Sequence, residues 1–581
     1  MVLDMTDTST TNGDNVASGS GFDDAVAALA QLSTTEYEMR RKNEAARPGG
    51  RVTALDRHVE AARARMQDGD DDDGSDDEVD SLPELAIDNK KKVGTVKELR
   101  NLFAAKGTYF EHGESPVHVV VPPGRDELPY ALPMKSQTVV VEAETICRPV
   151  DTQGKPTTLP SGLATMYLQG FRGSWRLRPL AGISTAPILS DDGSIRATEG
   201  YDEVTQLWCS QVPTIDVSAY PSPAEAEAAL KKLRHIFRSL PFADGKKVKE
   251  GRLLVIDQTE PPGHDESAFL VMFSTAIARP SLWLAPGYII NAPVVSGAGT
   301  GKGLLFRSIC TVAYGWNPVA VTAGHDRQEL DKRLSSELMR AQPAIFLDNM
   351  NAQTLRSNTL ASAITERPSR CRIMGTSKTV RLNTTAFIGV TGNGLSIGED
   401  LCRRFMNTEV DAGCENPELR EFEPGFRESV LAARPELLAA ALTIWRWGRQ
   451  QHSLKVGLPL GGFEKWSRWC RDPLLTLGCQ DPVKQIYRVK ERDLGRMDID
   501  ALYEQWEKDH GSNWVLADKL TEAVKERLPG LNPPFTRQAI VAALGRIRGT
   551  RVGGRVLEIH DPDGKWSASK YRVRESDTTR S

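Results

Sequence analysis

Apolar residues between positions 243 and 430 fall in short strand-like runs that alternate with segments of helical pattern. The most apolar of these runs are YIINAPVV, PAIFL and TAFIGV, and each leads into polar or glycine-rich residues. Strands that alternate with helices are typical of a parallel sheet flanked by helices. We therefore expect an α/β domain with a parallel sheet over residues 243–430.

The regions on either side of this domain carry different patterns. Residues 95–242 contain the runs VHVVV, TVVVEAE and ATMYLQ between Gly/Pro turns, which predicts strands in an α+β domain of unknown role. Residues 224–239 have apolar positions at helical spacing and predict an amphipathic helix that leads into the α/β domain. Residues 431–490 predict a helical subdomain. Its expected packing residues are Trp445, Trp447, Trp466 and Trp469.

The C-terminal region, residues 491–581, predicts two helices followed by a basic hairpin. This order is typical of a winged-helix-like domain, with residues 536–547 as the recognition helix. Such helices enter the major groove of DNA while the wings contact phosphates, but winged helices also serve as protein docks, so both roles stay open. The basic edge of the domain consists of Arg546, Arg548, Arg551 and Arg555.

The N-terminal 94 residues predict a largely disordered region with helical segments. Residues 1–24 are rich in Thr, Ser, Gly, Asp and Asn, and such a composition does not build a core. Residues 25–66 predict helical pieces, with a Pro-Gly-Gly break at 48–50. The acidic run at 68–80 is interpreted as a solvated linker that ends at a short basic patch.

Composition narrows the class of protein. A chain of 581 residues is long enough for three or four units, and 40% hydrophobic with 26% charged residues fits a globular protein. The eight cysteines are scattered, without the paired spacing of zinc or redox sites, which favours reduced thiols and a cytoplasmic location. We find neither a signal sequence nor an apolar run long enough to span a membrane. The net charge of −4 gives no overall attraction to nucleic acid.

The most informative segment is YIINAPVVSGAGTGKGLLFRSICTVA at 288–313. It joins an apolar strand to a helix expected to begin near Leu304. Glycines allow successive backbone N–H groups to surround a phosphate, and Lys302 can reach the β- and γ-phosphates of ATP. The match to the phosphate-loop motif is imperfect, because Ser296 takes the first Gly position and Gly303 replaces the Ser/Thr that normally binds Mg²⁺. The expected ATP-binding residues are Ser296, Gly297, Ala298, Gly299, Thr300, Gly301, Lys302, Gly303 and Leu304.

A second motif, PAIFLDN at 343–349, is an apolar strand that ends in an acid. The carboxylate of Asp348 is the candidate for holding magnesium opposite the phosphate loop. Asn349 stands where many phosphate-loop ATPases have a Glu that activates the attacking water. Either Asn349 orients that water or another carboxylate is the base, and the sequence does not distinguish these.

A third motif, TAFIGVTGNGLSIGEDLCRR at 385–404, again places a polar residue after an apolar strand. Asn393 is expected to polarise the attacking water beside the γ-phosphate. The segment EDLCRR predicts a short helix whose Arg403 or Arg404 contacts the nucleotide of a neighbouring subunit, because guanidinium is always charged and grips two phosphate oxygens. An arginine that acts in trans implies a ring. The alternative is a surface pair of arginines bound to Glu399 or Asp400.

Together these motifs resemble the ATPase part of superfamily III-like AAA+ helicases, found in primase–helicase proteins of phages, plasmids and mobile elements. The resemblance covers residues 243–490 well and the flanks loosely. It implies ATP and Mg²⁺ as cofactors, self-association into a hexameric ring, and single-stranded or forked DNA as partner. The region before the motor shows no primase site, which indicates a helicase without its own primase or one that works beside a separate primase. The segments that carry it are SGAGTGKG (296–303), FLDN (346–349), RCRIMGTSKTV (370–380), TGN (391–393) and EDLCRR (399–404).

The resemblance also implies a DNA-binding hairpin that points into the ring pore, here residues 370–381. Its cations, Arg372, Lys378 and Arg381, can follow a phosphate backbone regardless of base sequence, with Lys378 at the tip. The leading hypothesis is an ATP-driven DNA helicase. The alternative is a nucleotide-switched DNA-binding initiator with little unwinding activity, which Gly303 and Asn349 favour because both residues would slow hydrolysis.

Overall fold

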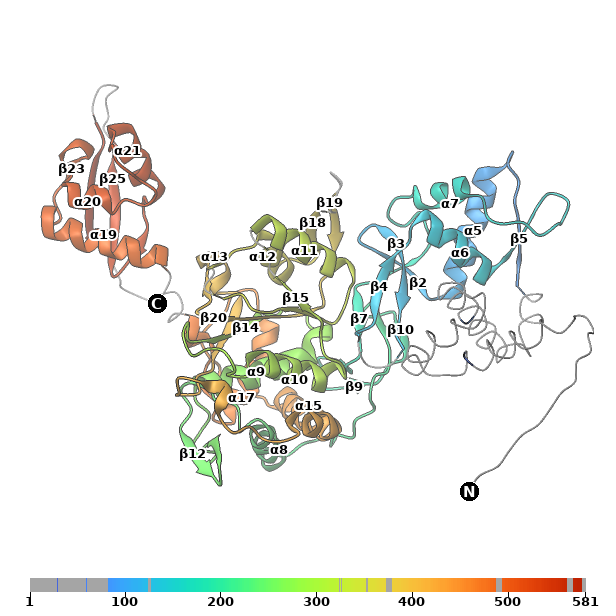
Figure 1. The fold of residues 1–581 in the computed structure, drawn as a ribbon, viewed down its shortest axis with the longest axis horizontal. Coiled ribbons are helices and arrows are strands. Elements are labelled where there is room, and N and C mark those ends of the chain that lie inside the picture. The colour runs from blue at the N-terminus through green and yellow to red at the C-terminus, as the bar shows by residue number, and fades with distance from the viewer. Residues whose placement is uncertain are drawn as a thin grey trace, which may run out of the picture. The chain divides into compact units, whose positions relative to one another are not determined.

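The computed structural model describes residues 82–123, 127–322, 324, 327–351, 354–372, 379–486, 494–561 and 568–576, with single residues at 29 and 59. Apart from residues 29 and 59, the expected N-terminal helical pieces lie outside these residues. The acidic run and Lys378 also lie outside them. The chain divides into two compact units, Met1–Thr95 with Val141–Leu159 and Val96–Val140 with Pro160–Ser581 (Figure 1). Within the described part, no helix is long and apolar enough to cross a bilayer.

The first unit is small. Its strands β1 (Glu84–Ala86) and β5 (Arg148–Val150) pair in parallel. An ion pair of 2.5 Å joins the Arg148 guanidinium to the Glu84 carboxylate at the start of this ladder.

The second unit begins with an α+β region whose strands form two small sheets and one further antiparallel pair, β8 (Ile188–Leu189) with β9 (Ile195–Arg196). Helix α5 (Lys92–Lys106) reaches this region from the first unit. The first sheet has the order β4-β3-β2-β6, and the predicted strand VHVVV lies in its β3. The second has the order β10-β11-β7. Their strands are β2 (Tyr109–His112), β3 (Ser115–Val120), β4 (Tyr130–Pro133), β6 (Arg178–Pro179), β7 (Gly182–Ser184), β10 (Gly200–Asp202) and β11 (Leu207–Cys209).

Two strands predicted in this region are wrong. TVVVEAE lies in helix α6 (Ser136–Ile146), and ATMYLQ lies largely in helix α7 (Ser161–Leu168). In α6 the buried residues are Val139, Ala143 and Ile146, which recur at the spacing of one helix face. The β-branched run suggested a strand, but the burial of these positions overrides that local preference.

The centre of the second unit is a five-stranded parallel sheet in the order β15-β16-β20-β14-β22. The predicted parallel sheet flanked by helices is thereby confirmed. Figure 1 draws α9 and α10 on one side of the sheet and α11 and α12 on the other. The strands are β14 (Gly287–Ala292), β15 (Ala320–Val321), β16 (Ala344–Leu347), β20 (Phe387–Asn393) and β22 (Phe405–Glu409). The helices are α9 (His264–Ala278), α10 (Lys302–Tyr314), α11 (Arg327–Met339), α12 (Asn358–Thr365) and α13 (Glu399–Cys402).

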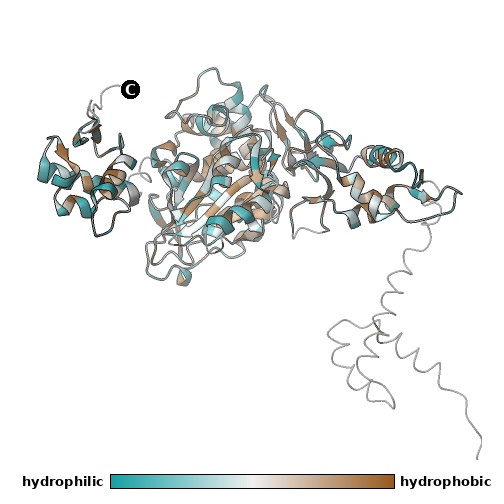
Figure 2. Cartoon of the chain, turned by 90° about the horizontal axis from the view of Figure 1, so that it is seen from above, coloured by the Kyte–Doolittle hydropathy of each residue, from teal (hydrophilic) through white to brown (hydrophobic). Residues whose placement is uncertain are grey.

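Helices before and after the sheet share its hydrophobic core. The predicted amphipathic helix is α8 (Pro223–Ile236), which packs against α15 (Arg434–Gln450). All four predicted tryptophans are buried, and the Trp466 indole donates a 2.8 Å hydrogen bond to Thr275 of α9. Figure 2 shows largely apolar strands at the centre, with helices that carry both apolar and polar faces around them. The remaining helices here are α14 (Phe426–Ala432), α16 (Glu464–Trp466), a π-helical turn (Ser467–Arg471) and α17 (Asp472–Thr476).

A short parallel pair, β17 (Thr354–Leu355) with β21 (Ser396–Ile397), and two antiparallel hairpins complete the sheet region. Strands β12 (Lys247–Glu250) and β13 (Leu253–Ile256) form one antiparallel hairpin, and β18 (Ser369–Arg372) and β19 (Thr379–Leu382) form another. The second hairpin is the one predicted at 370–381, with its tip outside the described residues.

The C-terminal part has a core of its own, built around Leu502, Trp506, Leu544 and Val573. A four-stranded antiparallel sheet in the order β23-β26-β25-β24 packs with three helices. Its elements are α19 (Leu494–His510), β23 (Val515–Leu516), α20 (Glu522–Glu526), α21 (Arg537–Arg546), β24 (Arg551–Val552), β25 (Arg555–His560) and β26 (Lys570–Glu575).

An aromatic stack fixes helix α10 on the sheet. The Phe306 ring stacks on Phe346 of β16, with centroids 4.6 Å apart, and on Phe387 of β20, with centroids 5.4 Å apart. It lies over Gly389 so closely that a Cβ there would be 1.8 Å from the Phe306 ring. The position of α10 therefore depends on the missing side chain at residue 389.

We predict that Gly389→Ala lowers the thermal midpoint of the core, because a buried methyl group at this site forces Phe306 out of its stack. Overpacking of this kind costs about 1–3 kcal/mol. The control is Gly461→Ala, since a Cβ there meets nothing within 4 Å. Thermal denaturation of both variants checks the prediction, and equal midpoints would contradict it.

Candidate functional site

Residues 293–301 connect the carboxyl end of β14 to the first turn of α10, as predicted. The helix begins at Lys302, two residues before the expected start at Leu304. Gly301 caps it with a φ of 97°, a left-handed conformation that glycine adopts without steric cost. The loop thus delivers backbone N–H groups at a helix N-terminus, which is an arrangement that attracts phosphate.

The Lys302 ammonium lies inside the curl of this loop. Its Nζ donates hydrogen bonds to the Gly297 carbonyl at 2.6 Å and to the Thr300 hydroxyl at 3.2 Å. Burial lowers the pKa of Lys302, while the negative charge of Asp348 opposes this shift. A phosphate bound in the loop would give the Lys302 ammonium negatively charged acceptor oxygens. These would replace the neutral carbonyl and hydroxyl oxygens that it contacts here.

The Asp348 carboxylate follows β16 and faces the start of α10. Its Oδ1 accepts hydrogen bonds from the Thr391 hydroxyl on β20 and from the Asn349 backbone N–H, the latter at 3.1 Å. Asn349 has a φ of 62° and an exposed side chain. Asparagine tolerates this left-handed conformation better than glutamate does, which is a backbone reason for Asn at this position.

Asn393 ends β20 beside the last residue of β14, Ala292. Its amide lies against the loop, because a Cβ added at Gly297 would be 2.7 Å from the Asn393 Oδ1. That oxygen is buried and has no hydrogen-bond partner among the described residues. Lys302, Asp348 and Asn393 are thus brought together by three strands that lie next to one another, β14, β20 and β16.

Arg403 and Arg404 lie away from this group, at the opposite end of the sheet. The Arg404 carbonyl accepts a 2.9 Å hydrogen bond from the N–H of Gly287, the first residue of β14. Because a six-residue strand spans about 17 Å, neither arginine is next to the loop of its own chain. Arg403 is exposed and Arg404 is half-buried.

Sequence reasoning missed Arg307, which lies one helical turn after Gly303. Its Nη2 is 3.5 Å from the Asp348 Oδ2, and its Cζ is 4.8 Å from the centre of the Phe346 ring. A Cβ added at Gly303 would be only 2.8 Å from the Arg307 Nη1. The spacing of four residues could have indicated that Gly303 and Arg307 share one helix face, but not the contact with Asp348.

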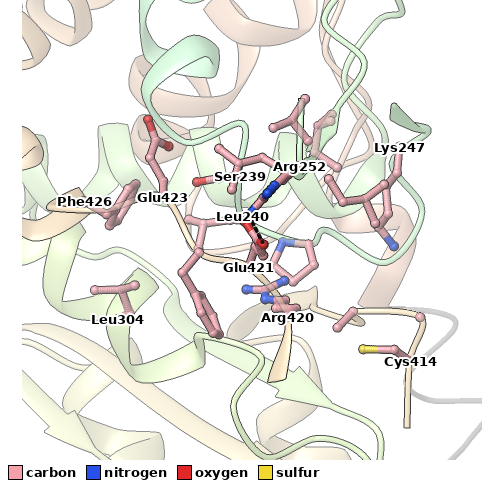
Figure 3. Close-up of a pocket in the computed structure, with 18 of the residues that line it drawn as sticks. Ser239, Leu240, Lys247, Arg252, Leu304, Cys414, Arg420, Glu421, Glu423 and Phe426 are labelled. Atoms are coloured by element: carbon pink, nitrogen blue, oxygen red, sulfur yellow. Dashed lines mark ion pairs between the residues drawn. The ribbon is translucent and has the colours of Figure 1, made fainter. Parts of the chain in front are cut away.

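A cavity of about 560 Å³ beside the loop was also missed (Figure 3). It adjoins the loop, because Leu240 is 3.6 Å from a Cβ added at Gly301 and the Arg420 Nη2 donates to the Thr300 carbonyl at 3.3 Å. Ligand pockets commonly measure about 300–1,000 Å³ and are mostly apolar. The cavity has the size and position to hold the base of a nucleotide whose phosphates lie in the loop. Its apolar lining includes Leu240, Val255, Leu304, Phe422 and Phe426.

The residues around Asp348 do not fit a magnesium ion held by the protein in the expected way. Gly303 and Leu304 offer no hydroxyl, and the Arg307 guanidinium brings positive charge to the carboxylate that would bind the ion. Among the described residues there is no group of three or more His, Cys, Asp or Glu that would hold a metal. Magnesium stays a prediction.

The β18–β19 hairpin presents a cationic face. Arg370 pairs directly with Arg381 across the two strands, and both are exposed, as is Arg372. Like charges opposite each other destabilise paired strands, so this pair of arginines does not stabilise the hairpin. Arg381 also forms an ion pair with Glu114 at 3.4 Å. Lys378 lies outside the described residues.

The basic edge predicted for the C-terminal part is partly neutralised. Arg548 pairs with Asp561 at 3.1 Å, and Arg555 pairs with Glu507 at 3.0 Å. The Arg546 Nη2 donates to the Pro529 carbonyl at 3.1 Å. The two ion pairs reduce the free positive charge that the sequence suggested for this surface, whereas the Arg546 contact leaves its charge in place.

Comparison with known proteins gives similar structures only. No family model and no curated protein matches the chain. The apo A form of the NrS-1 C-terminal region is 13% identical, with 82% of this chain and 98% of that chain covered and a TM-score of 0.35. SCCmec type IV Cch, described as an active helicase, is 11% identical, with 81% and 97% covered and a TM-score of 0.27. Because these TM-scores are low, neither likeness supports a functional assignment.

We predict that ATP protects Cys414 from alkylation. This thiol lines the cavity and is exposed, whereas the other seven cysteines are buried. A nucleotide base in the cavity would cover it, so labelling with a fluorescent maleimide should slow several-fold at saturating ATP. Lys302→Ala should lose the protection, and Cys414→Ser is the control for labelling elsewhere. Equal labelling rates at saturating ATP would place the base outside this cavity.

Proposed function

We propose that this chain is an ATP-hydrolysing motor that moves along DNA as part of a ring and separates duplex strands. The observation that carries the proposal is the convergence of the loop, Lys302, Asp348 and Asn393 at one end of the parallel sheet. The loop N–H groups and Lys302 would bind the phosphates of ATP. The adjoining cavity would take the base.

Hydrolysis needs a water molecule in line with the γ-phosphate, and Asn393 is the residue best placed to orient it. Its buried Oδ1 lies against the loop and has no hydrogen-bond partner among the described residues, so a water brought in with the nucleotide would supply the missing partner. Such positioning is a main part of catalysis in phosphoryl transfer. Asn349 is exposed and brings no carboxylate, so we do not assign it as the base.

The position of Arg403 and Arg404 supports action in trans. They lie a strand length from the loop of their own chain, so a nucleotide that they contact belongs to another copy. A head-to-tail contact of this kind closes into a ring when the rotation allows it. We propose a ring, with a hexamer as the form that the resemblance to superfamily III-like AAA+ helicases favours.

DNA would pass along the cationic face of the β18–β19 hairpin. Exposed arginines on one face can follow a phosphate backbone without reading its sequence. The C-terminal part, which we interpret as winged-helix-like, would be a second contact, with DNA or with a protein such as a separate primase. Its neutralised arginines make it the weaker DNA candidate.

A second candidate function is a nucleotide-switched DNA-binding initiator. It is favoured by Gly303 and Asn349, which remove a metal-binding hydroxyl and a carboxylate from positions that normally carry them. Such a protein would bind ATP and assemble on DNA but hydrolyse slowly.

We predict that single-stranded DNA stimulates ATP hydrolysis by the purified full chain, and that Lys302→Ala abolishes the activity. Phosphate release, measured with and without DNA, checks this. Unwinding of a forked duplex would follow. ATP binding without DNA-stimulated hydrolysis would reject the motor and leave the initiator.

We predict that the double variant Arg370→Ala/Arg372→Ala binds single-stranded DNA more weakly and with less dependence on salt. Each lost phosphate contact reduces the slope of log affinity against log salt by about 0.7, so the slope should fall by about 1.4. Arg381→Ala is the matched comparison and should have a smaller effect, because Glu114 already neutralises Arg381. Fluorescence anisotropy at several salt concentrations measures the slopes, and an unchanged slope in the double variant would remove the hairpin from the DNA path.

A further inference from the structure

The space beside Gly303 is filled by a guanidinium. In the usual phosphate-loop motif a Ser or Thr side chain occupies residue 303 and faces the acid of the second motif. Here a Cβ at residue 303 would lie 3.8 Å from both Asp348 carboxylate oxygens and 2.8 Å from the Arg307 Nη1. The Arg307 side chain has therefore taken the position of the missing side chain.

Arg307 is held there from two sides. Its Cζ lies 4.8 Å from the Phe346 ring centre, at cation–π distance, and its Nη2 is 3.5 Å from the Asp348 Oδ2. Phe346 is in turn stacked on Phe306, one residue before Arg307. The guanidinium is thus positioned by the same aromatic stack that fixes α10.

Most of the donors of this guanidinium are available. Arginine has five N–H donors, and the contact with Asp348 is the one hydrogen bond of the Arg307 side chain among the described residues. The side chain is 30% exposed, so a ligand can reach it. The fork of a guanidinium matches the oxygens of a phosphate and carries a permanent charge.

We propose that Arg307 is a phosphate-binding residue that takes over part of the charge neutralisation usually supplied by magnesium at this position. The proposal rests on the function proposed above, since it requires a nucleotide in the loop. Gly303 is then not a degraded metal ligand but the residue that makes room for Arg307. Nucleotide binding by this chain should depend less on a divalent ion than the loss of the hydroxyl alone would suggest.

The test is the affinity of a fluorescent ATP analogue for the full chain, in excess Mg²⁺ and in EDTA. For the natural chain we expect the two dissociation constants to differ by only about three-fold. Arg307→Ala should weaken binding about ten-fold or more in EDTA, the size expected for a lost charge-assisted hydrogen bond. The same change should weaken binding much less in Mg²⁺, so the ratio of the two constants rises.

Three further variants separate charge from packing. Arg307→Gln keeps a flexible polar side chain but removes the charge, and it should behave like Arg307→Ala. Lys332→Ala removes a cation of α11 that is 53% exposed and does not line the cavity, and it should leave the ratio unchanged. Gly303→Ser/Arg307→Ala restores a hydroxyl without the guanidinium, and it should bind tightly in Mg²⁺ and weakly in EDTA.

The outcomes distinguish this inference from the proposed function. If the natural chain binds no nucleotide in Mg²⁺, the proposed function fails. If it binds in Mg²⁺ but the ratio of the two constants is the same in Arg307→Ala and Arg307→Gln as in the natural chain, only the role of Arg307 is overturned. Circular dichroism of each variant shows whether it is folded.

Discussion

The stack of Phe306 on Phe346 and Phe387 is the interaction on which the site depends. It ties the first turns of α10, and therefore the loop and Lys302, to the two strands that carry Asp348 and Asn393. Phe346 is two residues before Asp348, and it is also the ring under the Arg307 guanidinium. A shift of this stack would move the loop, the acid and the arginine together, because interiors as dense as this one transmit displacement rather than absorb it.

Two departures from the usual motifs have local physical reasons. Asn349 adopts a left-handed backbone conformation, in which its N–H reaches the Asp348 carboxylate, and this conformation disfavours the glutamate that many motors carry there. Gly303 lacks a side chain where Arg307 needs the space. Neither residue is therefore sufficient evidence for an inactive site, since each satisfies a constraint of the surrounding structure.

Much of the fold around the loop was predictable, because its signals are local. SGAGTGKG, FLDN and TGN each follow an apolar run, and the carboxyl ends of parallel strands meet at one edge of a sheet. Helices α6 and α7 were not predicted, since only tertiary burial distinguishes the helical face Val139, Ala143 and Ile146 from a β-branched strand. The Arg307–Asp348 contact joins residues 41 positions apart, and the cavity draws on several separate segments, so neither has a local signature.

In the function that we propose, the two ends of the parallel sheet would carry complementary parts of one reaction. The loop end would supply phosphate donors, an acid and an amide for water, while the other end would supply Arg403 or Arg404 to another copy. One copy alone would then lack the trans arginine that stabilises transferred charge, a contribution of about 10³–10⁵ in rate where such arginines operate. Arg307 does not replace the trans arginine, because the Arg307 guanidinium contacts Asp348 and Phe346 of its own chain. Nucleotide binding would therefore be a property of the single chain, and ATP hydrolysis a property of the assembly. Assembly on DNA would then control the rate of hydrolysis.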